Sequence, residues 1–434
     1  MPGFFHSVNL DKSKCVGCTN CIKRCPTEAI RVRDGKAVIA SERCIDCGEC
    51  IRICPHHAKK AISNPMSMLE NYKYNIALPA PTLYGQFNNL DDIDYILNGL
   101  EKIGFDWVYE VSKAAELVSE ATRKLLEENK LKKPVISSSC PAVVRLIRVR
   151  FPDLCENVLP LKSPMEMAAY MAKKSASKRT GLPFEDIGCF FITSCPAKVT
   201  DIKMPLGIET SMVDGAISIS EIFPPLSQAM DKLDPEELKL IANSGIIGVS
   251  WATSGGESAA LLNDKYLAAD GIENVIRVLD EVEDERIGDL DFIELSACAG
   301  GCVGGVMCVE NPYVAKARIQ ILRKYLPVAK NHLKTGIVPE SMEWQESLEF
   351  SDVMTLSEDI NEAFRMMVEM DKIAQKLPGI DCGACGAPTC RAFAEDIIQG
   401  KGKVADCILI YRERIKKMSA KMPDLEDTDT EIKL

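Results

Sequence analysis

Cysteine is the residue type in this 434-residue chain that points most strongly to chemistry. The chain contains 19 cysteines in three groups: eight between residues 15 and 54, seven in the middle, and four between residues 382 and 407. Where thiols are kept reduced, clustered cysteines serve metal binding or catalysis more often than disulfide formation. The distribution therefore predicts several metal centres rather than a disulfide framework.

The first group is an internal repeat with the spacing of bacterial iron–sulfur proteins. Each half reads Cys-x2-Cys-x2-Cys-x3-Cys-Pro, a run in which the fourth cysteine binds the cluster of the other half. We therefore predict two 4Fe-4S clusters, one held by Cys15, Cys18, Cys21 and Cys54, and the other by Cys44, Cys47, Cys50 and Cys25. A pair of zinc sites is the alternative, but zinc does not require eight cysteines in this register.

The last group has a different spacing, Cys382-x2-Cys385-x4-Cys390-x16-Cys407. Four soft thiolates suit either zinc or an iron–sulfur cluster. The Gly, Ala and Pro residues between them let backbone amides approach cluster sulfur closely. The stretch resembles the small 4Fe-4S domain of membrane redox complexes and of acetyl-CoA synthase partner subunits. We predict a third 4Fe-4S cluster here, with zinc as the alternative.

Four of the middle cysteines follow apolar segments that are typical of buried strands. Cys140 comes after PVISSS, Cys195 after CFFITS, and Cys298 and Cys302 after FIELSA. Since open α/β sheets build their sites at the carboxyl ends of strands, these thiols are predicted to share one site. Proline after Cys140 and Cys195 suits a helix start, and a helix N-terminus favours thiolate over thiol. Four such thiolates can hold one cubane.

The elements that must position these thiols are strands alternating with helices from about residue 74 to 350. Apolar runs predict strands at 76–80, 107–111, 134–138, 189–193, 245–249 and 292–295, and amphipathic segments predict helices at 114–130 and 164–178. Such alternation indicates an α/β domain with parallel sheets, predicted here at 70–355. A two-cluster ferredoxin-like α+β domain (1–63) precedes it, and a connector helix with a small cysteine-rich 4Fe-4S domain (356–434) follows it.

The connector helix is predicted to begin near Ser357, where Thr355 and Glu358 have capping-box spacing. It should carry apolar residues on roughly one face and end before Pro378.

Composition limits the partners and the surroundings. The formal net charge of −11 disfavours nucleic acid and anionic membrane surfaces as main partners, although residues 1–63 are locally basic. No run of 18 apolar residues exists, so no membrane span is expected. The N-terminal segment lacks a basic-then-apolar signal and a twin arginine, which predicts a cytoplasmic protein.

The three central segments resemble the active-site signatures of FeFe-hydrogenases, in order and with suitable intervals. With the ferredoxin repeat, the resemblance covers about residues 1–350. It implies that Cys140, Cys195, Cys298 and Cys302 bind the 4Fe-4S part of an H-cluster. Cys302 would bridge to a diiron unit carrying CO, cyanide and an azadithiolate, and Lys198 would hydrogen-bond an iron-bound cyanide. The implied reaction is reversible H2 oxidation and proton reduction, with electrons relayed through the 4Fe-4S clusters.

Three positions depart from the pattern of the fast members of this family. Ser139 stands where they carry a second cysteine that relays protons, and an alcohol is a far weaker acid than a thiol. Thr193 and Ser296 stand where methionines flank the diiron unit. The pattern resembles sensory FeFe-hydrogenases, without the PAS domain that some of them carry, and implies slow turnover.

Protons then need another route, for which the sequence offers four carboxylates near strand ends but no choice among them. They are Glu110, Glu116, Glu257 and Glu294, and a solvated surface role is the expected reading for each.

The resemblance implies H2 and protons as substrates and a redox partner such as a ferredoxin or a signalling protein, and it leaves a homodimer open. A non-catalytic iron–sulfur protein is the second reading, such as the assembly factors that resemble these enzymes but lack the diiron unit. A pure electron carrier is the third. Assembly factors generally lack a complete two-cluster repeat, and a carrier leaves Lys198 and the central cysteines unexplained. Cys155 and Cys189 are expected to be core thiols, with a place near the cofactor left open for Cys308.

Overall fold

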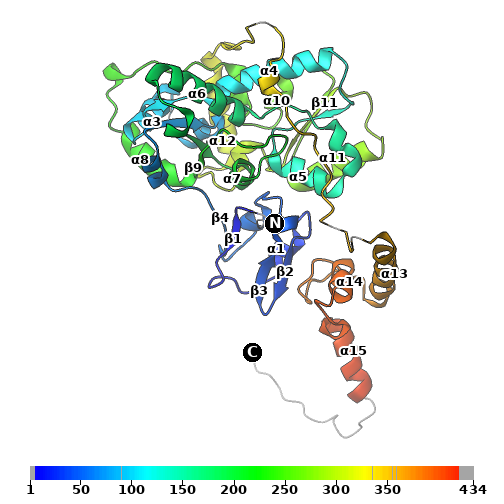
Figure 1. The fold of residues 1–434 in the computed structure, drawn as a ribbon. Helices are drawn as coiled ribbons and strands as arrows, with labels where there is room; N and C mark the ends of the chain where they lie inside the picture. The colour runs from blue at the N-terminus through cyan, green and yellow to red at the C-terminus, as the bar shows by residue number, and fades with distance from the viewer. Residues whose placement is uncertain (1–4, 89, 335, 354, 358, 420–434) are drawn as a thin grey trace. The chain divides into compact units, whose positions relative to one another are not determined.

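The computed structural model describes residues 5–419 except 89, 335, 354 and 358. The chain divides into two compact units (Figure 1). The first comprises the residues up to Asn9, Cys44–Arg52 and Lys59–Ser351, and the second comprises Leu10–Arg43, Ile53–Ala58 and the residues from Asp352 onward. The cysteine-rich N-terminal segment therefore contributes residues to both units.

Two parallel sheets form the frame of the first unit. One has the order β6 (Trp107–Val108), β5 (Tyr74–Pro79), β8 (Ile187–Thr193), β9 (Gly215–Ser218). The other has the order β10 (Tyr266–Asp270), β11 (Phe292–Ser296), β7 (Val135–Ile136). All neighbouring strands in both sheets run parallel, so the carboxyl ends within each sheet share one edge. The predicted α/β class with parallel sheets is confirmed.

Helices cover both faces of the four-stranded sheet because its central strands are apolar on both sides. Cys189 and Phe191 of β8 belong to a core with α4 (Val111–Glu127) and α6 (Pro164–Thr180). Phe190 and Ile192 belong to a second core with α3 (Asp94–Lys102) and α8 (Ile219–Met230). Such continuous apolar runs are typical of parallel strands buried between helical layers.

The three-stranded sheet packs against α5 (Pro141–Arg150) and α11 (Ile272–Glu283) in a third core. The first unit also contains α2 (Glu49–Arg52), α7 (Pro196–Lys203), α9 (Ile246–Ser250), α10 (Gly256–Ala259) and α12 (Pro312–Leu322). Strand β4 (Lys59–Ala61) pairs with β1 (Val8–Leu10).

The strand predicted at 245–249 is wrong, because these residues form the short helix α9. Its first free amides have tertiary partners: Gly245 N donates to Glu116 Oε1 at 2.5 Å, and Ile246 N donates to the Pro327 carbonyl at 2.7 Å. At Gly248 a Cβ would lie 2.1 Å from the Ser112 carbonyl oxygen, so only glycine allows this close approach to α4. Tertiary contacts thus decide the conformation of a short apolar run.

The strand predicted at 107–111 is shorter than expected. Only Trp107 and Val108 pair with β5, and the chain enters α4 at Val111. Strands β9 and β10 were not predicted.

In the second unit, β2 (Ile30–Arg33) and β3 (Lys36–Ile39) form an antiparallel pair next to α1 (Asn20–Lys23). The C-terminal helices are α13 (Ile360–Lys376), α14 (Cys390–Ile398) and α15 (Ile408–Ser419), and α13 packs against α14 (Figure 1). No helix in the described part of the chain is long and apolar enough to cross a membrane.

The connector helix ends before Pro378 as predicted, but its predicted start is wrong. The N-cap is Asp359, whose side chain accepts hydrogen bonds from Asn361 N and Glu362 N. The Thr355 hydroxyl donates instead to the Asp352 carbonyl, and Glu358 lies outside the described residues. An aspartate N-cap satisfies the first helical amides directly, which removes the need for a capping box.

Candidate active site

The carboxyl ends of β7, β8 and β11 meet at one cavity of about 100 Å³ in the first unit. Cys140 and Cys195 directly precede α5 and α7, so the helix starts predicted after them are confirmed. Cys302 opens the short 3-10 turn Cys302–Gly304, and it lines the cavity with Cys140 and Cys195. Cys298 interacts electrostatically with Cys140 and Cys302. The structure therefore brings the four central cysteines together.

Glycines allow the segment after β11 to approach its neighbours closely enough to present two of these thiols. Gly301 has a φ of +88°, and a Cβ there would lie 2.3 Å from Ser254 N. A Cβ on Gly305 would lie 2.3 Å from the Ser194 carbonyl oxygen. No larger residue fits either position without a shift of backbone, so the Gly-rich pattern serves to position Cys298 and Cys302.

The electrostatics of these thiols fit a bound cluster. Burial raises the pKa of the Cys195, Cys298 and Cys302 thiols far above the ordinary range, and the neighbouring thiols raise it further. Several thiolates can coexist in such a place only with a compensating metal. Cysteine thiolate is the usual ligand of iron–sulfur clusters, so this donor set fits a 4Fe-4S cluster.

The other predicted site residues lie around the same cavity. Its lining includes Ser139, Thr193, Lys198 and Ser296. The Lys198 ammonium pairs with the Asp201 carboxylate at 3.6 Å, which restrains the lysine side chain. Thr193 Oγ1 accepts a hydrogen bond from Cys195 N at 3.0 Å, so this hydroxyl also holds the backbone of a candidate ligand.

Glu257 is the cavity residue with the most unusual environment. Its Oε2 accepts a hydrogen bond from Ser137 Oγ at 2.7 Å, and its side chain also bonds to that of Ser139. Its Oε1 is buried without a hydrogen-bond partner in the described part of the chain. Burial, followed by the nearby charge of Glu294, raises the pKa of Glu257 to about 8. At neutral pH this carboxyl therefore holds a proton next to Ser139.

The surface role expected for the four candidate carboxylates is wrong, because all four are buried. Glu294 lines the cavity with Glu257, and its oxygens accept from Gly255 N at 2.9 Å and Ser258 N at 2.8 Å. Glu110 and Glu116 lie outside the cavity lining and bind backbone amides of the loops at 243–245 and 330–331. Glu257 and Glu294 thus lie at the cavity, whereas Glu110 and Glu116 hold loops outside its lining.

The raised pKa of Glu257 predicts a pH dependence of stability in the metal-free protein. The Glu257 carboxyl binds a proton more readily in the folded protein than in the unfolded chain. Its contribution to the free energy of unfolding is therefore complete below pH 4.5 and is lost as pH rises through about 8. We expect Glu257→Gln to reduce the decline in the free energy of unfolding across this window, by an amount on the order of a few kcal/mol. Denaturant titrations at several pH values measure it, with exposed Glu128→Gln as the control. An unchanged decline in Glu257→Gln would contradict the raised pKa.

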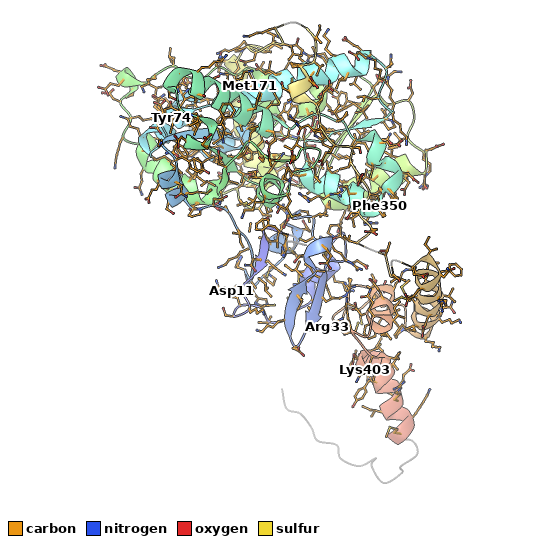
Figure 2. The ribbon with its side chains drawn as sticks, in the orientation of Figure 1. Asp11, Arg33, Tyr74, Met171, Phe350 and Lys403 are labelled. Carbon is orange, nitrogen blue, oxygen red and sulfur yellow. The ribbon has the colours of Figure 1, made fainter. Side chains whose placement is uncertain are left out.

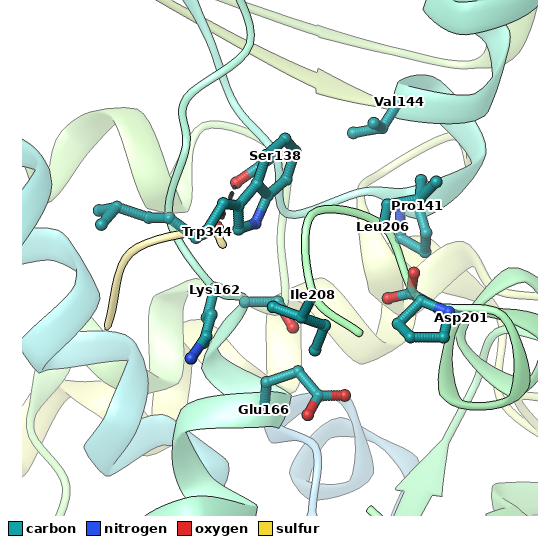
Figure 3. A pocket seen from close by; sticks show the side chains of 12 residues that line it. Ser138, Pro141, Val144, Lys162, Glu166, Asp201, Leu206, Ile208 and Trp344 are labelled. Carbon is teal, nitrogen blue, oxygen red and sulfur yellow. Dashed lines mark hydrogen bonds between the residues drawn. The ribbon is translucent and has the colours of Figure 1, made fainter. Parts of the chain in front are cut away.

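A second, smaller cavity of about 20 Å³ adjoins the first, since it is lined by Ser138, Pro141 and Asp201 (Figure 3). Glu166 also lines it, and its carboxylate accepts from Ser211 Oγ at 2.5 Å and from Met212 N at 3.0 Å. A space of this size admits about one water molecule.

The cysteines of the ferredoxin repeat receive backbone hydrogen bonds that suit cluster ligands. Cys15, Cys25 and Cys54 accept bonds at Sγ from the amides of Ala37 (3.4 Å), Ala29 (3.2 Å) and Ala58 (3.3 Å). Such amides stabilise thiolate sulfur. One predicted set, Cys15, Cys18, Cys21 and Cys54, lies wholly in the second unit.

The four C-terminal cysteines, Cys382, Cys385, Cys390 and Cys407, line one pocket in the second unit. Of the remaining thiols, Cys155 and Cys189 are buried in cores, as predicted. Cys308 Sγ lies 4.0 Å from the Cys302 carbonyl oxygen, close to the central site.

Comparison with known proteins agrees with this arrangement. The family model described as iron only hydrogenase large subunit, C-terminal domain, matches residues 73–269 and 262–306. A 4Fe-4S dicluster domain model matches residues 7–55, and an Fe-S cluster model matches residues 377–409.

Three curated relatives span different shares of the chain. Iron hydrogenase 1 of Clostridium pasteurianum is 24% identical over 411 residues, covering 76% of this chain and 72% of that protein. The periplasmic [Fe] hydrogenase large subunit of Nitratidesulfovibrio vulgaris is 26% identical over 364 residues, covering 70% and 86%. The cytosolic Fe-S cluster assembly factor NAR1 of Scheffersomyces stipitis is 25% identical over 207 residues, covering 41% and 38%. Since the first family model spans more than half of the chain, the chain belongs to the iron-only (FeFe) hydrogenase family, with iron–sulfur domains on both sides of its hydrogenase domain.

Proposed function

We propose that the protein activates H2 reversibly and slowly at an H-cluster in the central cavity, in a sensory role, and relays electrons through 4Fe-4S clusters. The observation that carries the proposal is that Cys140, Cys195, Cys302 and the Lys198 ammonium line one cavity, with the Cys298 thiol next to them. Both hydrogenase relatives support it, because each is matched over at least 70% of both chains.

In this proposal, Cys140, Cys195, Cys298 and Cys302 would hold the 4Fe-4S part of the cluster, and Cys302 would also hold the diiron unit. When bound, the diiron unit supplies an open iron site and a base at which H2 is split. The Lys198 ammonium donates a charge-assisted hydrogen bond to a cyanide ligand, and Asp201 keeps the ammonium in place.

Protons pass through Ser139 and Glu257. Ser139 and Glu257 both line the cavity, and the Glu257 carboxyl holds a proton at neutral pH and can return it. Glu294, whose oxygens accept hydrogen bonds from the Gly255 and Ser258 amides, also lines the cavity and is the next acceptor. The weak acidity of the Ser139 hydroxyl makes this relay slow. A slow relay suits a sensor, which has to register H2 rather than turn over large amounts.

The alternative is a non-catalytic iron–sulfur protein for electron transfer or cluster assembly. The similarity to the assembly factor supports this alternative. Infrared spectroscopy separates the two. Anaerobic protein supplied with the diiron cofactor is expected to bind iron for four cubanes plus two further irons, and to show CO and cyanide bands. Replacing the core thiol in Cys155→Ala should leave these bands unchanged, whereas Cys302→Ala should remove them. A wild-type protein that binds its 4Fe-4S clusters but shows no CO or cyanide bands would favour the non-catalytic alternative.

A further inference from the structure

The C-terminal cysteine pocket packs directly against the ferredoxin part of the second unit. Val32 N donates to the Gly386 carbonyl at 2.8 Å, and Lys23 Nζ donates to the Pro388 carbonyl at 2.9 Å. A Cβ on Gly383 would lie 2.9 Å from Lys23 Cε and 3.5 Å from Ile22 Cδ1. Ile22 and Lys23 directly follow Cys21, so the loop between Cys382 and Cys385 lies against the segment that carries Cys21.

Buried ion pairs fix this contact. Arg31 binds the Asp396 carboxylate at 2.9 Å, and Arg33, which is labelled in Figure 2, binds it at 2.5 Å. Arg43 binds Glu395 at 2.5 Å. Asp396 is 4% exposed and Glu395 9%, so the carboxylates of these pairs are largely shielded from solvent. Charge-assisted bonds from guanidinium groups to carboxylates impose a defined geometry. The helix that begins at Cys390 is therefore held firmly on the strand that follows the first cluster motif.

The same pocket has exposed apolar residues in its lining, and the segment around its last cysteine is rich in basic residues. Ile380 and Ile408 line the pocket and are 61% and 52% exposed, and Tyr411 on the next turn of α15 is 50% exposed. Six Lys/Arg residues and two Asp/Glu residues lie between positions 397 and 419, and all eight are exposed. The chain as a whole has a net charge of −11, so this excess of basic residues is unusual in it. Exposed apolar residues close to an excess of positive charge favour a partner of the opposite sign.

We infer that the C-terminal cluster is the port through which the protein exchanges electrons with a small acidic one-electron carrier. Inside the protein, its electron-transfer neighbour is the cluster predicted at Cys15, Cys18, Cys21 and Cys54. Each transfer moves one electron and no proton: the reduced C-terminal cluster is oxidised by one electron and the carrier is reduced by one. Two such transfers remove the electrons of one H2, so the inference extends the proposed function and rests on it.

Charge reversal on the port tests the docking. The probe is a small acidic two-cluster ferredoxin, and its binding to the cluster-loaded full chain is measured by calorimetry at several ionic strengths. Lys403→Glu with Arg412→Glu is expected to weaken binding by at least about ten-fold at low salt, and less as salt rises. The matched control, Lys178→Glu with Lys232→Glu, makes the same charge change at exposed positions of the first unit. Equal affinity in both double variants, or wild-type binding without salt dependence, would overturn the docking surface.

Removing the port cluster tests the electron path. In stopped-flow experiments without H2, ferredoxin reduced by dithionite should reduce the remaining clusters at least about ten-fold more slowly in Cys382→Ser/Cys385→Ser than in the wild type. The reduced wild type should also show spin–spin coupling between neighbouring clusters that this variant lacks. Unchanged transfer rates or unchanged signals would overturn the inference. Because neither the binding nor this transfer needs H2, a failure of H2 activation would appear separately, in the infrared experiment.

Discussion

Replacing Glu257 by glutamine is expected to lower the rate of H2 oxidation by about two to three orders of magnitude, because the amide cannot accept and return a proton. The substitution preserves size and one hydrogen-bonding oxygen, so Ser137 Oγ can still donate to position 257. The four central thiols and Lys198 are not altered. The CO and cyanide bands should therefore remain while turnover falls, which separates a defect in proton transfer from a loss of cofactor.

Glu166→Gln is the matched control for this experiment. Glu166 is also buried, and burial raises its pKa as well, but it lines the smaller cavity and is hydrogen-bonded by Ser211 and Met212 (Figure 3). H2 turnover, measured with a saturating artificial acceptor, should stay within about a factor of two of the wild type. If Glu166→Gln were as slow as Glu257→Gln, protons would leave through the smaller cavity instead.

Replacing Ser139 by cysteine is expected to raise turnover by about one to two orders of magnitude, since a thiol with a pKa of roughly 8.5 relays protons far more readily than an alcohol. Ser139 lines the cavity and bonds to Glu257, so the new thiol would stand in the existing route. The wild-type rate should lie well below that of the fast family members, with the cofactor fully loaded. A wild-type rate as high as theirs would defeat the sensory reading.

The neighbouring residue provides the control for this gain. Ser138 donates to the Leu161 carbonyl at 3.0 Å and lines the smaller cavity, so Ser138→Cys adds a thiol beside the site but outside the route. Rates at equal diiron occupancy, judged by infrared band intensity, compare the two variants. Equal rates in Ser139→Cys and the wild type would place the limitation in electron transfer or in another proton route.

The candidate ligand residues could be named from the sequence because their spacing is typical of cluster binding. The two Cys-x2-Cys-x2-Cys-x3-Cys-Pro runs and the strand-then-Cys-Pro pattern at Cys140 and Cys195 are local features that the structure keeps. Alternation of apolar runs with amphipathic segments gave the parallel α/β class for the same reason, since each element shows its burial in its own sequence.

The environment of Glu257 could not be predicted, because it is made by residues distant in sequence. Its partners are Ser137, Ser139 and Glu294, which come from segments of two other strands, and no spacing around Gly255-Gly256-Glu257 indicates that they meet. Helix α9 could not be predicted for the same reason. Glu116 and the Pro327 carbonyl accept hydrogen bonds from the amides of its first turn, and both lie far from it in sequence. Local patterns cannot report contacts of this kind.

The four central thiols come from two separate sheets, Cys195 from the end of β8 and the other three from the ends of β7 and β11. Once they share one cluster, they cross-link the two sheets and close chain loops between Cys140, Cys195 and Cys302. A metal site that closes long loops lowers the conformational entropy of the unfolded chain and so favours the folded state. Binding of the cluster and folding of the α/β unit are then thermodynamically linked, so the chain without the cluster is expected to have a lower free energy of unfolding.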